Sequence, residues 1–199
     1  MFQTIENYET YEIEVKRSRF IAEVFYIENE TSARQKIDEI KKKYFDAKHH
    51  VFSYKIDSVE RFSDDGEPQG TAGAPLLDII KKRNLNNILV VITRYFGGTL
   101  LGTGGLVKAY SDVFNLALNN AKIVNKDKGI EYEIKIKYEN LEKIKYICQS
   151  ENISIKNVDY GTEITMTLTS YKEKYEKIIQ NYNLIDDSKI IDENVVINV

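Results

Sequence analysis

The sequence predicts an α+β fold in two domains, residues 1–128 and 129–199. The chain of 199 residues is long enough for two small domains, and its 42% hydrophobic and 30% charged residues are ordinary for a globular protein. A polar stretch that ends in glycine, NKDKG at 125–129, indicates the boundary. After it, the expected elements follow the order β-α-β-β-α-β, which is typical of a ferredoxin-like domain.

The first half is expected to form a sheet with helices packed on it. Alternating segments at 8–15 and 18–27 predict two strands, and HHVFSYKI at 49–56 predicts a third. The unbroken apolar run NILVVIT at 87–93 predicts a strand that is buried on both faces. Three helices have recognisable starts, at a cap on Ser32, at Pro75 and after Thr103.

The second half alternates more regularly. Apolar and charged residues alternate from Ile130 to Tyr138, which predicts a strand with one buried face. Asn140 is expected to cap a helix, and Ser170 with Glu173 forms a capping-box signature for a second helix. Further strands are predicted at 153–160 and 164–168. The apolar residues expected on the second helix and on a last strand are Tyr175, Ile178, Ile179, Tyr182, Val195, Ile197 and Val199.

The composition excludes several classes of protein. The formal net charge of −3 gives no general basic field that would attract nucleic acid. No apolar run approaches the length of a membrane span, and residues 1–15 lack the basic start and apolar core of a secretory signal, so we expect a cytoplasmic protein with no membrane partner. The single cysteine, Cys148, excludes an intrachain disulfide, and its place on an apolar helix stripe predicts a buried, inert thiol.

The stretch ITRYFGGTLLGTGGLVKAY at 92–110 has the glycine density of a phosphate-binding loop, yet it matches neither named motif. Thr103 stands where a P-loop requires lysine, and Val107 interrupts a dinucleotide-binding fingerprint. A more general feature remains, because small residues open a helix and expose its first N–H groups at the positive end of the helix dipole. The candidates for binding an anion or ligand here are Arg94, Gly98, Gly102, Thr103, Gly104, Gly105 and Lys108.

A second stretch, RFSDDGEPQGTAGAP at 61–75, ends in a similar pattern. Gly70, Thr71 and Gly73 also precede a helix, so the two helix starts could converge on one anion if they lie close together. The favoured alternative is that the glycines only allow sharp turns and close packing of helices on a sheet.

Three carboxylates in this stretch, Asp64, Asp65 and Glu67, carry oxygen ligands suited to a divalent cation. They equally suit a hairpin turn in which one carboxylate pairs with Arg61 or Arg94, and turn chemistry favours this second interpretation. We therefore expect no metal.

The only histidines, His49 and His50, are neighbours in a predicted strand and point to opposite faces, so they cannot serve one site together. Neither belongs to a zinc-binding pattern, and the chain has no G-x-S-x-G nucleophile elbow. With Asp64, Asp65 and Glu67, one of them could line a polar cleft. We predict no catalytic residue and no cofactor.

A modest basic patch joins the first two strands. Its residues Lys16, Arg17 and Arg19 are suited to RNA or to an acidic protein partner. Two other basic runs, 41–43 and 81–83, fall at predicted helix ends, where cations favour the helix dipole. In the second half, the sheet face opposite the core carries charged residues and threonines, so base stacking of the RNA-recognition type is not expected there.

These motifs closely resemble the IMPACT/YigZ family: DA-x-HH at 46–50, SDDGEPQGTAG at 63–73, TRYFGGTLLGTGGLVKAY at 93–110 and KRSRFIAEV at 16–24. The resemblance covers nearly the whole chain. It implies a first domain of the β-α-β type found in a ribosomal small-subunit protein and in domain four of elongation factor G, and a second domain like domain five of that factor. Val51 stands where many members have a cysteine, which excludes any role for that thiol.

The resemblance also implies a link to translation, since eukaryotic relatives restrain a starvation-responsive translation kinase by competing for its activating partner. Some bacterial relatives carry a proline-dipeptidase label, which no metal-ligand set in this sequence supports. We predict a non-enzymatic regulator that binds the ribosome, RNA or a protein partner. The main alternative is an enzyme or a phosphate- or nucleotide-binding protein that uses the glycine-rich helix starts. A third is a protein-interaction module on the second domain's sheet. The oligomeric state stays open, and a monomer is compatible with the sequence.

Overall fold

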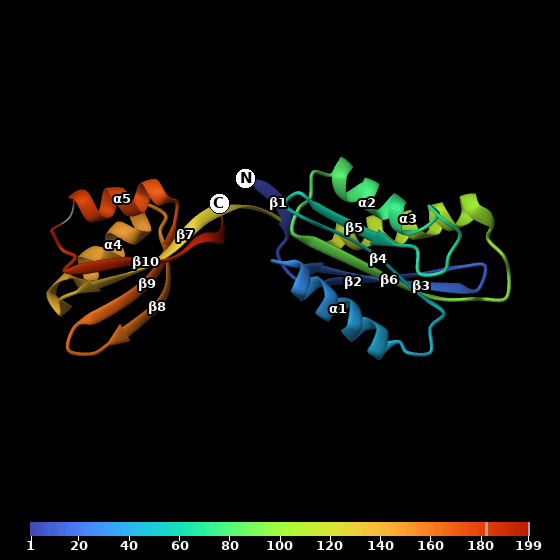
Figure 1. Ribbon diagram of the computed structural model, residues 1–199, viewed down its shortest axis with the longest axis horizontal. Coiled ribbons are helices and arrows are strands. Elements are labelled where there is room, and N and C mark those ends of the chain that lie inside the picture. Colours follow the sequence, from blue (N-terminus) through green and yellow to red (C-terminus); the bar gives the residue numbers. More distant parts are fainter. Residues whose placement is uncertain (182, 199) are drawn as a thin grey trace. The chain divides into compact units, whose positions relative to one another are not determined.

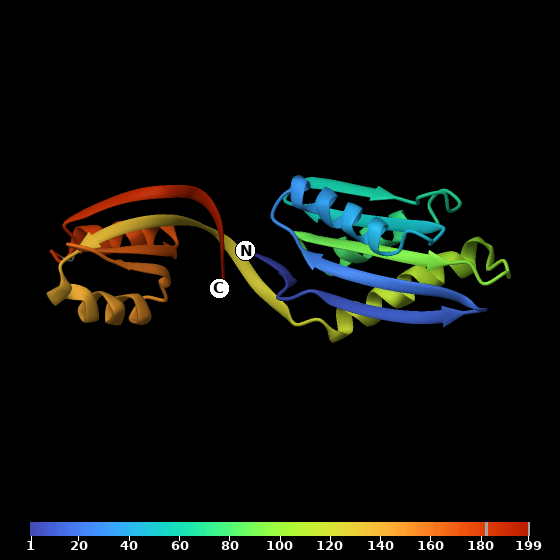
Figure 2. The same ribbon diagram turned by 90° about the horizontal axis from the view of Figure 1, so that it is seen from below.

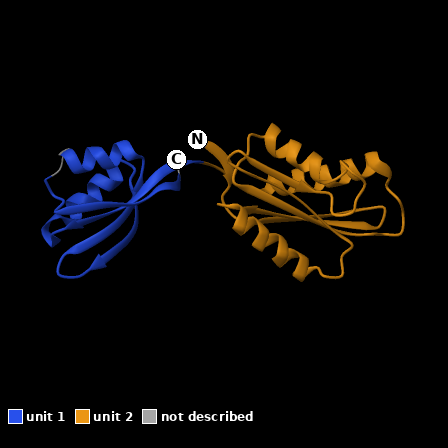
Figure 3. Ribbon diagram, viewed as in Figure 1, with its two compact units in different colours: residues 1, 126–199 blue, residues 2–125 orange. Residues whose placement is uncertain are grey.

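The computed structural model describes residues 1–181 and 183–198 and divides the chain into two compact units (Figure 3). The first unit in chain order comprises residues 2–125 (orange, labelled unit 2 in Figure 3), and the second comprises residues 126–199 together with Met1 (blue, labelled unit 1). Both units contain strands and helices, so the predicted α+β class with two domains is confirmed. Tyr182 and Val199, which we expected on the last helix and strand, lie outside the described residues.

One antiparallel sheet organises the first unit, with the strand order β2-β3-β6-β4-β5. Helix α1 (Glu30–Lys43) packs on one face, while α2 (Gly73–Lys82) and α3 (Gly102–Asn120) pack on the other (Figures 1 and 2). A short strand β1 (Phe2–Ile5) precedes the sheet. The sheet strands are β2 (Glu9–Val15), β3 (Ser18–Tyr26), β4 (His49–Ile56), β5 (Val59–Ser63) and β6 (Ile88–Tyr95).

Strand β6 is the centre of this unit. Val90 and Ile92 pack with the residues of α2 and α3, whereas Leu89 and Val91 pack with those of α1. Its residues are buried from Ile88 through Arg94, which confirms the prediction of a strand covered on both faces. The charged side chain of Arg94, which follows this apolar run, therefore lies in the protein interior.

Two helix starts in this unit differ from the prediction. Asn29 accepts the N–H of Ser32 and caps α1, so Ser32 is the third helical residue rather than the cap. Helix α2 begins at Gly73, before Pro75, because the Asp64 carboxylate accepts the N–H of Gly73. Strands β1 and β5 were not predicted, since β1 is short and β5 is exposed or half-buried along its whole length.

The second unit has the predicted β-α-β-β-α-β order, with its strands paired antiparallel as β10-β7-β9-β8. Alternate residues of β7, such as Tyr132 and Ile134, are buried in its core. None of the helices in the described ranges is long and apolar enough to cross a membrane. The elements are β7 (Ile123–Ile136), a 3₁₀ turn (Tyr138–Asn140), α4 (Leu141–Ser150), β8 (Ser154–Tyr160), β9 (Ile164–Ser170), α5 (Lys172–Asn181) and β10 (Asp187–Asn198).

Three signals in the second half have other roles than expected. The stretch 125–129, at whose start the two units divide, is not a loop, because it lies within β7 and its residues 126–129 pair with β10. The hydroxyl of Ser170 donates to the carbonyl of Tyr171 instead of capping α5. The side chain of Asn140 donates to the carbonyl of Leu184, and α4 lacks a side-chain cap among the described residues.

Cys148 provides a test of the core of the second unit. The residue lies on the buried face of α4 and is 1% exposed, and this burial raises the pKa of its thiol to about 11. Because the thiolate is the reactive species, we expect a thiol reagent such as DTNB to label the native chain at neutral pH far more slowly than the chain in denaturant. Equal rates in the two conditions would contradict the packing of α4.

Candidate functional site

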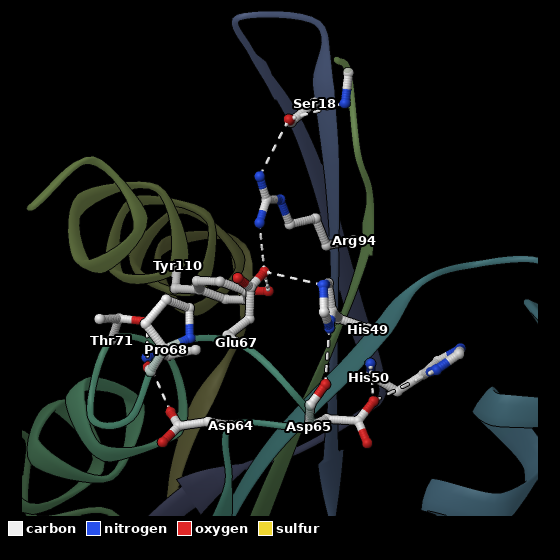
Figure 4. Close-up of polar contacts among 12 residues, drawn as sticks. Ser18, His49, His50, Asp64, Asp65, Glu67, Pro68, Thr71, Arg94 and Tyr110 are labelled. Carbon is white, nitrogen blue, oxygen red and sulfur yellow. Dashed lines mark hydrogen bonds and ion pairs between the residues drawn. The ribbon is translucent and has the colours of Figure 1, made fainter. Parts of the chain in front are cut away.

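Several segments that are far apart in the sequence meet at one end of the first unit's sheet. Arg94 at the end of β6 lies opposite His49 at the start of β4. Tyr95 lies opposite Arg19, which places the turn between β2 and β3 at the same end. The loop between β5 and α2 folds back over these residues (Figure 4).

Asp64 closes the start of α2. Its carboxylate accepts the N–H groups of Gly70, Ala72 and Gly73 at 2.8, 3.1 and 2.7 Å. A carboxylate of the chain therefore already sits where an external anion would bind. The hydroxyl of Thr71 is also engaged, since it donates to the carbonyl of Pro68. This corrects the prediction that Gly70, Thr71 and Gly73 offer their groups to a ligand.

A buried ion pair joins this loop to β6. Arg94 Nη1 donates to Glu67 Oε1 at 2.5 Å, and the Tyr110 hydroxyl on α3 donates to the same oxygen at 2.9 Å (Figure 4). Arg94 is 4% exposed and Glu67 is 9% exposed. Burial and the adjacent Glu67 carboxylate raise the pKa of Tyr110 far above its usual range, which keeps its hydroxyl protonated. The prediction that one carboxylate pairs with Arg61 or Arg94 is confirmed, with Glu67 and Arg94 as the pair.

The two histidines point to opposite faces, as predicted. His49 Nδ1 lies 2.7 Å from the carbonyl oxygen of Asp65, and His50 Nε2 lies 3.0 Å from the carbonyl oxygen of Tyr44, which follows α1. The Asp65 carboxylate accepts the N–H of His50 at 2.6 Å. Because a carbonyl can only accept, each of these ring nitrogens carries a proton. His49 therefore faces the α3 side of the sheet, and His50 faces the α1 side.

Arg94 also connects the site to the turn between β2 and β3. Its Nη2 donates to the Ser18 hydroxyl at 3.4 Å, and the same oxygen accepts the N–H of Gly97 at 3.1 Å. Lys16 and Arg17 form the two-residue turn with φ angles of 48° and 64°. Such a left-handed pair normally favours Asn-Gly. The hydrogen bonds of Ser18 with Arg94 and Gly97 therefore hold the turn in a conformation that Lys16 and Arg17 do not themselves favour.

The basic patch in the structure contains other residues than the sequence predicted. Arg19 is paired with Glu12 by two hydrogen bonds of 2.5 and 2.7 Å, so its charge is compensated. Lys16 and Arg17 have no carboxylate partner among the described residues, and Lys48 adds a third cation, 5.7 Å from the centre of the Phe96 ring. We call Lys16, Arg17 and Lys48 the basic end of the sheet.

A cleft of about 470 Å³ opens beside the ion pair. Of the predicted ligand residues, it brings together Arg94, Gly102, Thr103, Glu67 and His49. Its other walls are formed by residues that the sequence did not single out, namely Lys48, Gly66, Pro68, Phe96, Leu100, Leu101 and Leu106. The exposed Phe96 and Leu100, apolar residues within a glycine-rich loop, were the one signal in the sequence that could have indicated this wall.

The remaining candidates lie outside this lining. Lys108 pairs with Asp112 one turn along α3, at 2.8 Å. Gly98 has a φ of +81° and serves a turn. Gly104 and Gly105 belong to the first turn of α3 behind Thr103. The two glycine-rich helix starts therefore do not offer their N–H groups to one shared anion, because the first is closed by Asp64 and only the second borders the cleft.

The polar groups of this site are largely engaged with one another. Asp64 caps a helix, Glu67 pairs with Arg94, and Asp65 holds the backbone of His50. The described residues contain no group of three or more histidine, cysteine or acidic side chains that could hold a metal ion. The arrangement thus offers a cleft with Lys48 in its lining and with carboxylates that are already engaged within the chain.

The polar face of the second unit's sheet is also internally paired. Glu131 pairs with Lys156, Glu133 with Lys189 at 2.7 Å, and Lys135 with Asp187 at 3.5 Å. Exposed pairs of this kind contribute little to stability, but they leave few unpaired charges for a partner.

Comparisons with known proteins agree with these features. The family described as "Impact N-terminal domain" matches residues 16–118, and the family described as "Domain of unknown function (DUF1949)" matches residues 134–181. "IMPACT family member YvyE" of Bacillus subtilis (strain 168) is 34% identical over 81% of this chain and 76% of its own length. "IMPACT family member YigZ" of Escherichia coli (strain K12) is 36% identical over 74% of each chain. A solved structure titled "Crystal structure of an hypothetical protein" is 29% identical, covers 95% of both chains and superposes with a TM-score of 0.66.

Proposed function

The chain belongs to the IMPACT family, and on that premise we propose that it is a non-enzymatic, translation-linked binding protein that contacts ribosomal RNA through the basic end of the first unit. One observation carries the proposal. The acidic groups of the site are engaged in contacts within the chain, whereas Lys16, Arg17 and Lys48 have no carboxylate partner among the described residues.

RNA suits this surface better than an acidic protein does. Phosphates attract unpaired cations, and single-stranded bases stack on exposed aromatic rings. Phe96 is 44% exposed and lies beside Lys48. Because the chain as a whole carries a net charge of −3, the attraction is local and depends on these few residues.

The direct test is sedimentation of the purified chain with ribosomes at low salt, followed by steps of rising salt. We expect it to pellet with ribosomes and to be released as the salt concentration rises. If it stays in the supernatant at low salt and retains no RNA, the proposal fails. If the chain is retained on ribosomes only through a ribosomal protein, the proposed RNA contact is wrong and a protein contact takes its place.

A double substitution separates the charge of the basic turn from its shape. Replacing Lys16 with asparagine and Arg17 with glycine keeps the left-handed turn, for which Asn-Gly is favoured, and removes both charges. We expect unchanged or higher stability, weaker binding to ribosomes, and a slope of log affinity against log salt reduced by about 0.7 for each lost phosphate contact.

The matched control is Lys81→Ala with Lys82→Ala, which removes two cations at the far end of α2 from this site. It should leave ribosome binding and its salt dependence unchanged. Equal effects of the two double variants would mean that net charge, and not the basic end, determines binding.

A further inference from the structure

The two G-T-x-G helix starts differ in whether a side chain of the protein caps them, although their sequences are alike. At α2, Asp64 accepts three backbone N–H groups. At α3, no side chain among the described residues caps the helix, and its first turn contains no acidic residue. A Cβ built at Gly102 or Gly104 would meet nothing within 4 Å, so the space around this helix start is open. The positive end of the α3 dipole therefore faces the cleft without an anion of the chain.

Two buried side chains in the same cleft have unused polar atoms. His49 is 8% exposed, and its Nδ1 is held by the Asp65 carbonyl, so in the neutral ring Nε2 keeps a free lone pair. Glu67 Oε1 lies 3.9 Å from Nε2, which is too far for a hydrogen bond (Figure 4). Arg94 is 4% exposed, and its Nε has no hydrogen-bond partner. The unused Nε2 of His49, which lines the cleft, points to a missing polar ligand independently of the helix start, whereas the Nε of Arg94 is enclosed by the protein.

The remaining residues of the cleft indicate that another part of the ligand is apolar. Phe96, Leu100, Leu101 and Leu106 make its walls mainly apolar, and Lys48 lies at the edge over the Phe96 ring. The one acidic residue of the lining, Glu67, is compensated by Arg94 at 2.5 Å. The volume of about 470 Å³ lies within the range of small-molecule sites.

We propose that this cleft binds a phosphate monoester attached to an aromatic group, with the phosphate at the start of α3 and the aromatic group against Phe96. A nucleotide, either free or at the phosphorylated end of an RNA, has this chemistry. The proposal goes beyond the ribosome contact, because it adds the start of α3 and the interior of the cleft to Lys48 and Phe96, which the two surfaces share, and does not use the basic turn.

The chemistry of His49 favours a monoester over a carboxylate or a phosphodiester. In the tautomer that the Asp65 carbonyl holds, Nε2 can only accept a hydrogen bond, and a phosphate monoester, with a second pKa near 6, still carries a proton part of the time at neutral pH. A carboxylate or a phosphodiester at neutral pH has no proton to donate to Nε2. The N–H groups at the start of α3 favour the negative charge of the phosphate.

The test uses the full chain labelled with ¹⁵N at its ten glycines. Adenosine 5′-monophosphate is expected to shift the amide signals of Gly102, Gly104 and Gly105, inorganic phosphate to shift them at higher concentration, and adenosine to shift them least. Gly70 and Gly73 should not move, because Asp64 already occupies their amides. If the nucleotide leaves the three α3 glycines unmoved at millimolar concentration, the proposal is wrong.

A charged substitution provides the second arm. Thr103→Asp places a carboxylate at the start of α3, where it favours the helix dipole and should keep the fold. It should weaken nucleotide binding at least about tenfold by repulsion of like charges, whereas Thr103→Asn should keep most of the binding. Undiminished binding by a folded Thr103→Asp variant would overturn the proposal.

The source of the phosphate is distinguished by comparing a short oligoribonucleotide with a 5′-phosphate and the same oligonucleotide with a 5′-hydroxyl. Tighter binding of the 5′-phosphorylated oligonucleotide than of adenosine 5′-monophosphate identifies an RNA end as the ligand. Equal affinity for the phosphorylated oligonucleotide and for adenosine 5′-monophosphate identifies the free nucleotide. Equal binding of the two oligonucleotides would contradict recognition of a monoester. Since Thr103→Asp leaves Lys16 and Arg17 intact, retained ribosome binding by this variant separates failure of the cleft from failure of the ribosome contact.

Discussion

Replacing Glu67 with alanine is expected to lower the free energy of unfolding of the first unit by about 3–5 kcal/mol, because it leaves a buried arginine without its counter-charge. Arg94 is 4% exposed and donates to Glu67 Oε1 at 2.5 Å. Its other hydrogen bond, to Ser18, is long at 3.4 Å and cannot compensate a full charge. Hydrogen exchange of the β6 amides, followed by mass spectrometry, measures this change in the first unit alone.

Two matched variants separate the charge from the hydrogen bonds. Tyr110→Phe removes only the second donor to Glu67 and should cost about 1 kcal/mol. The double variant Glu67→Ala with Arg94→Met removes both charges and should be more stable than Glu67→Ala alone. If Glu67→Ala costs no more than Tyr110→Phe, Arg94 is reached by water in the native protein and the site is more open than the geometry indicates.

This ion pair links the stability of the site to its proposed functions. Arg94 lines the cleft, and its contact with Ser18 reaches the turn that carries Lys16 and Arg17. A loss of Glu67 should therefore disturb both surfaces, and Glu67 is itself part of the cleft lining. Variants at Lys16 and Arg17 or at Thr103 should each affect only one of them.

The fold was predictable wherever the sequence has long periodic runs. The apolar run 87–93 identified β6 as a doubly covered strand, and the alternation of β7 identified the first strand of the second unit. Short or exposed elements gave weaker signals, so β1 and β5 were missed. We predicted Ser32 as the N-cap of α1, whereas the structure has Asn29 in that place. The two residues form reciprocal hydrogen bonds between side chain and backbone, and either residue type is common at an N-cap, so the sequence did not distinguish them.

The site was predictable in its residue types but not in its contacts. The pairing of a loop carboxylate with Arg94 followed from charge, but the choice of Glu67 depends on Asp65 and Gly66, which turn the loop with φ angles of 45° and 84°. Asp64 reaches amides six to nine positions ahead only because of that turn. Its role as a cap, which closes one of the two similar helix starts, therefore has no signature in local spacing.

Gly97→Ala is the second substitution with a large expected effect. A Cβ at this position would lie 2.0 Å from the backbone carbon and 2.2 Å from the backbone oxygen of Arg17. These are backbone atoms of a two-residue turn, so they cannot move aside as a flexible side chain would. We expect a loss of at least about 3 kcal/mol, at the upper end for overpacking, together with loss of ribosome binding, measured by denaturation and by sedimentation.

Gly104→Ala is the matched control for that substitution, because a Cβ there meets nothing within 4 Å and the residue lies in the first turn of α3. It should leave the stability unchanged or raise it by up to about 1 kcal/mol, since alanine favours a helix over glycine. If Gly97→Ala unfolds no more easily than Gly104→Ala, the β2–β3 turn can move away from the 96–101 loop. Lys16 and Arg17 would then not be held by the Arg94–Ser18–Gly97 contacts, and the basic end could not act as a preformed binding surface. A large difference between the two variants would instead mean that the chain fixes the position of both cations before any partner binds, so little ordering is required on association.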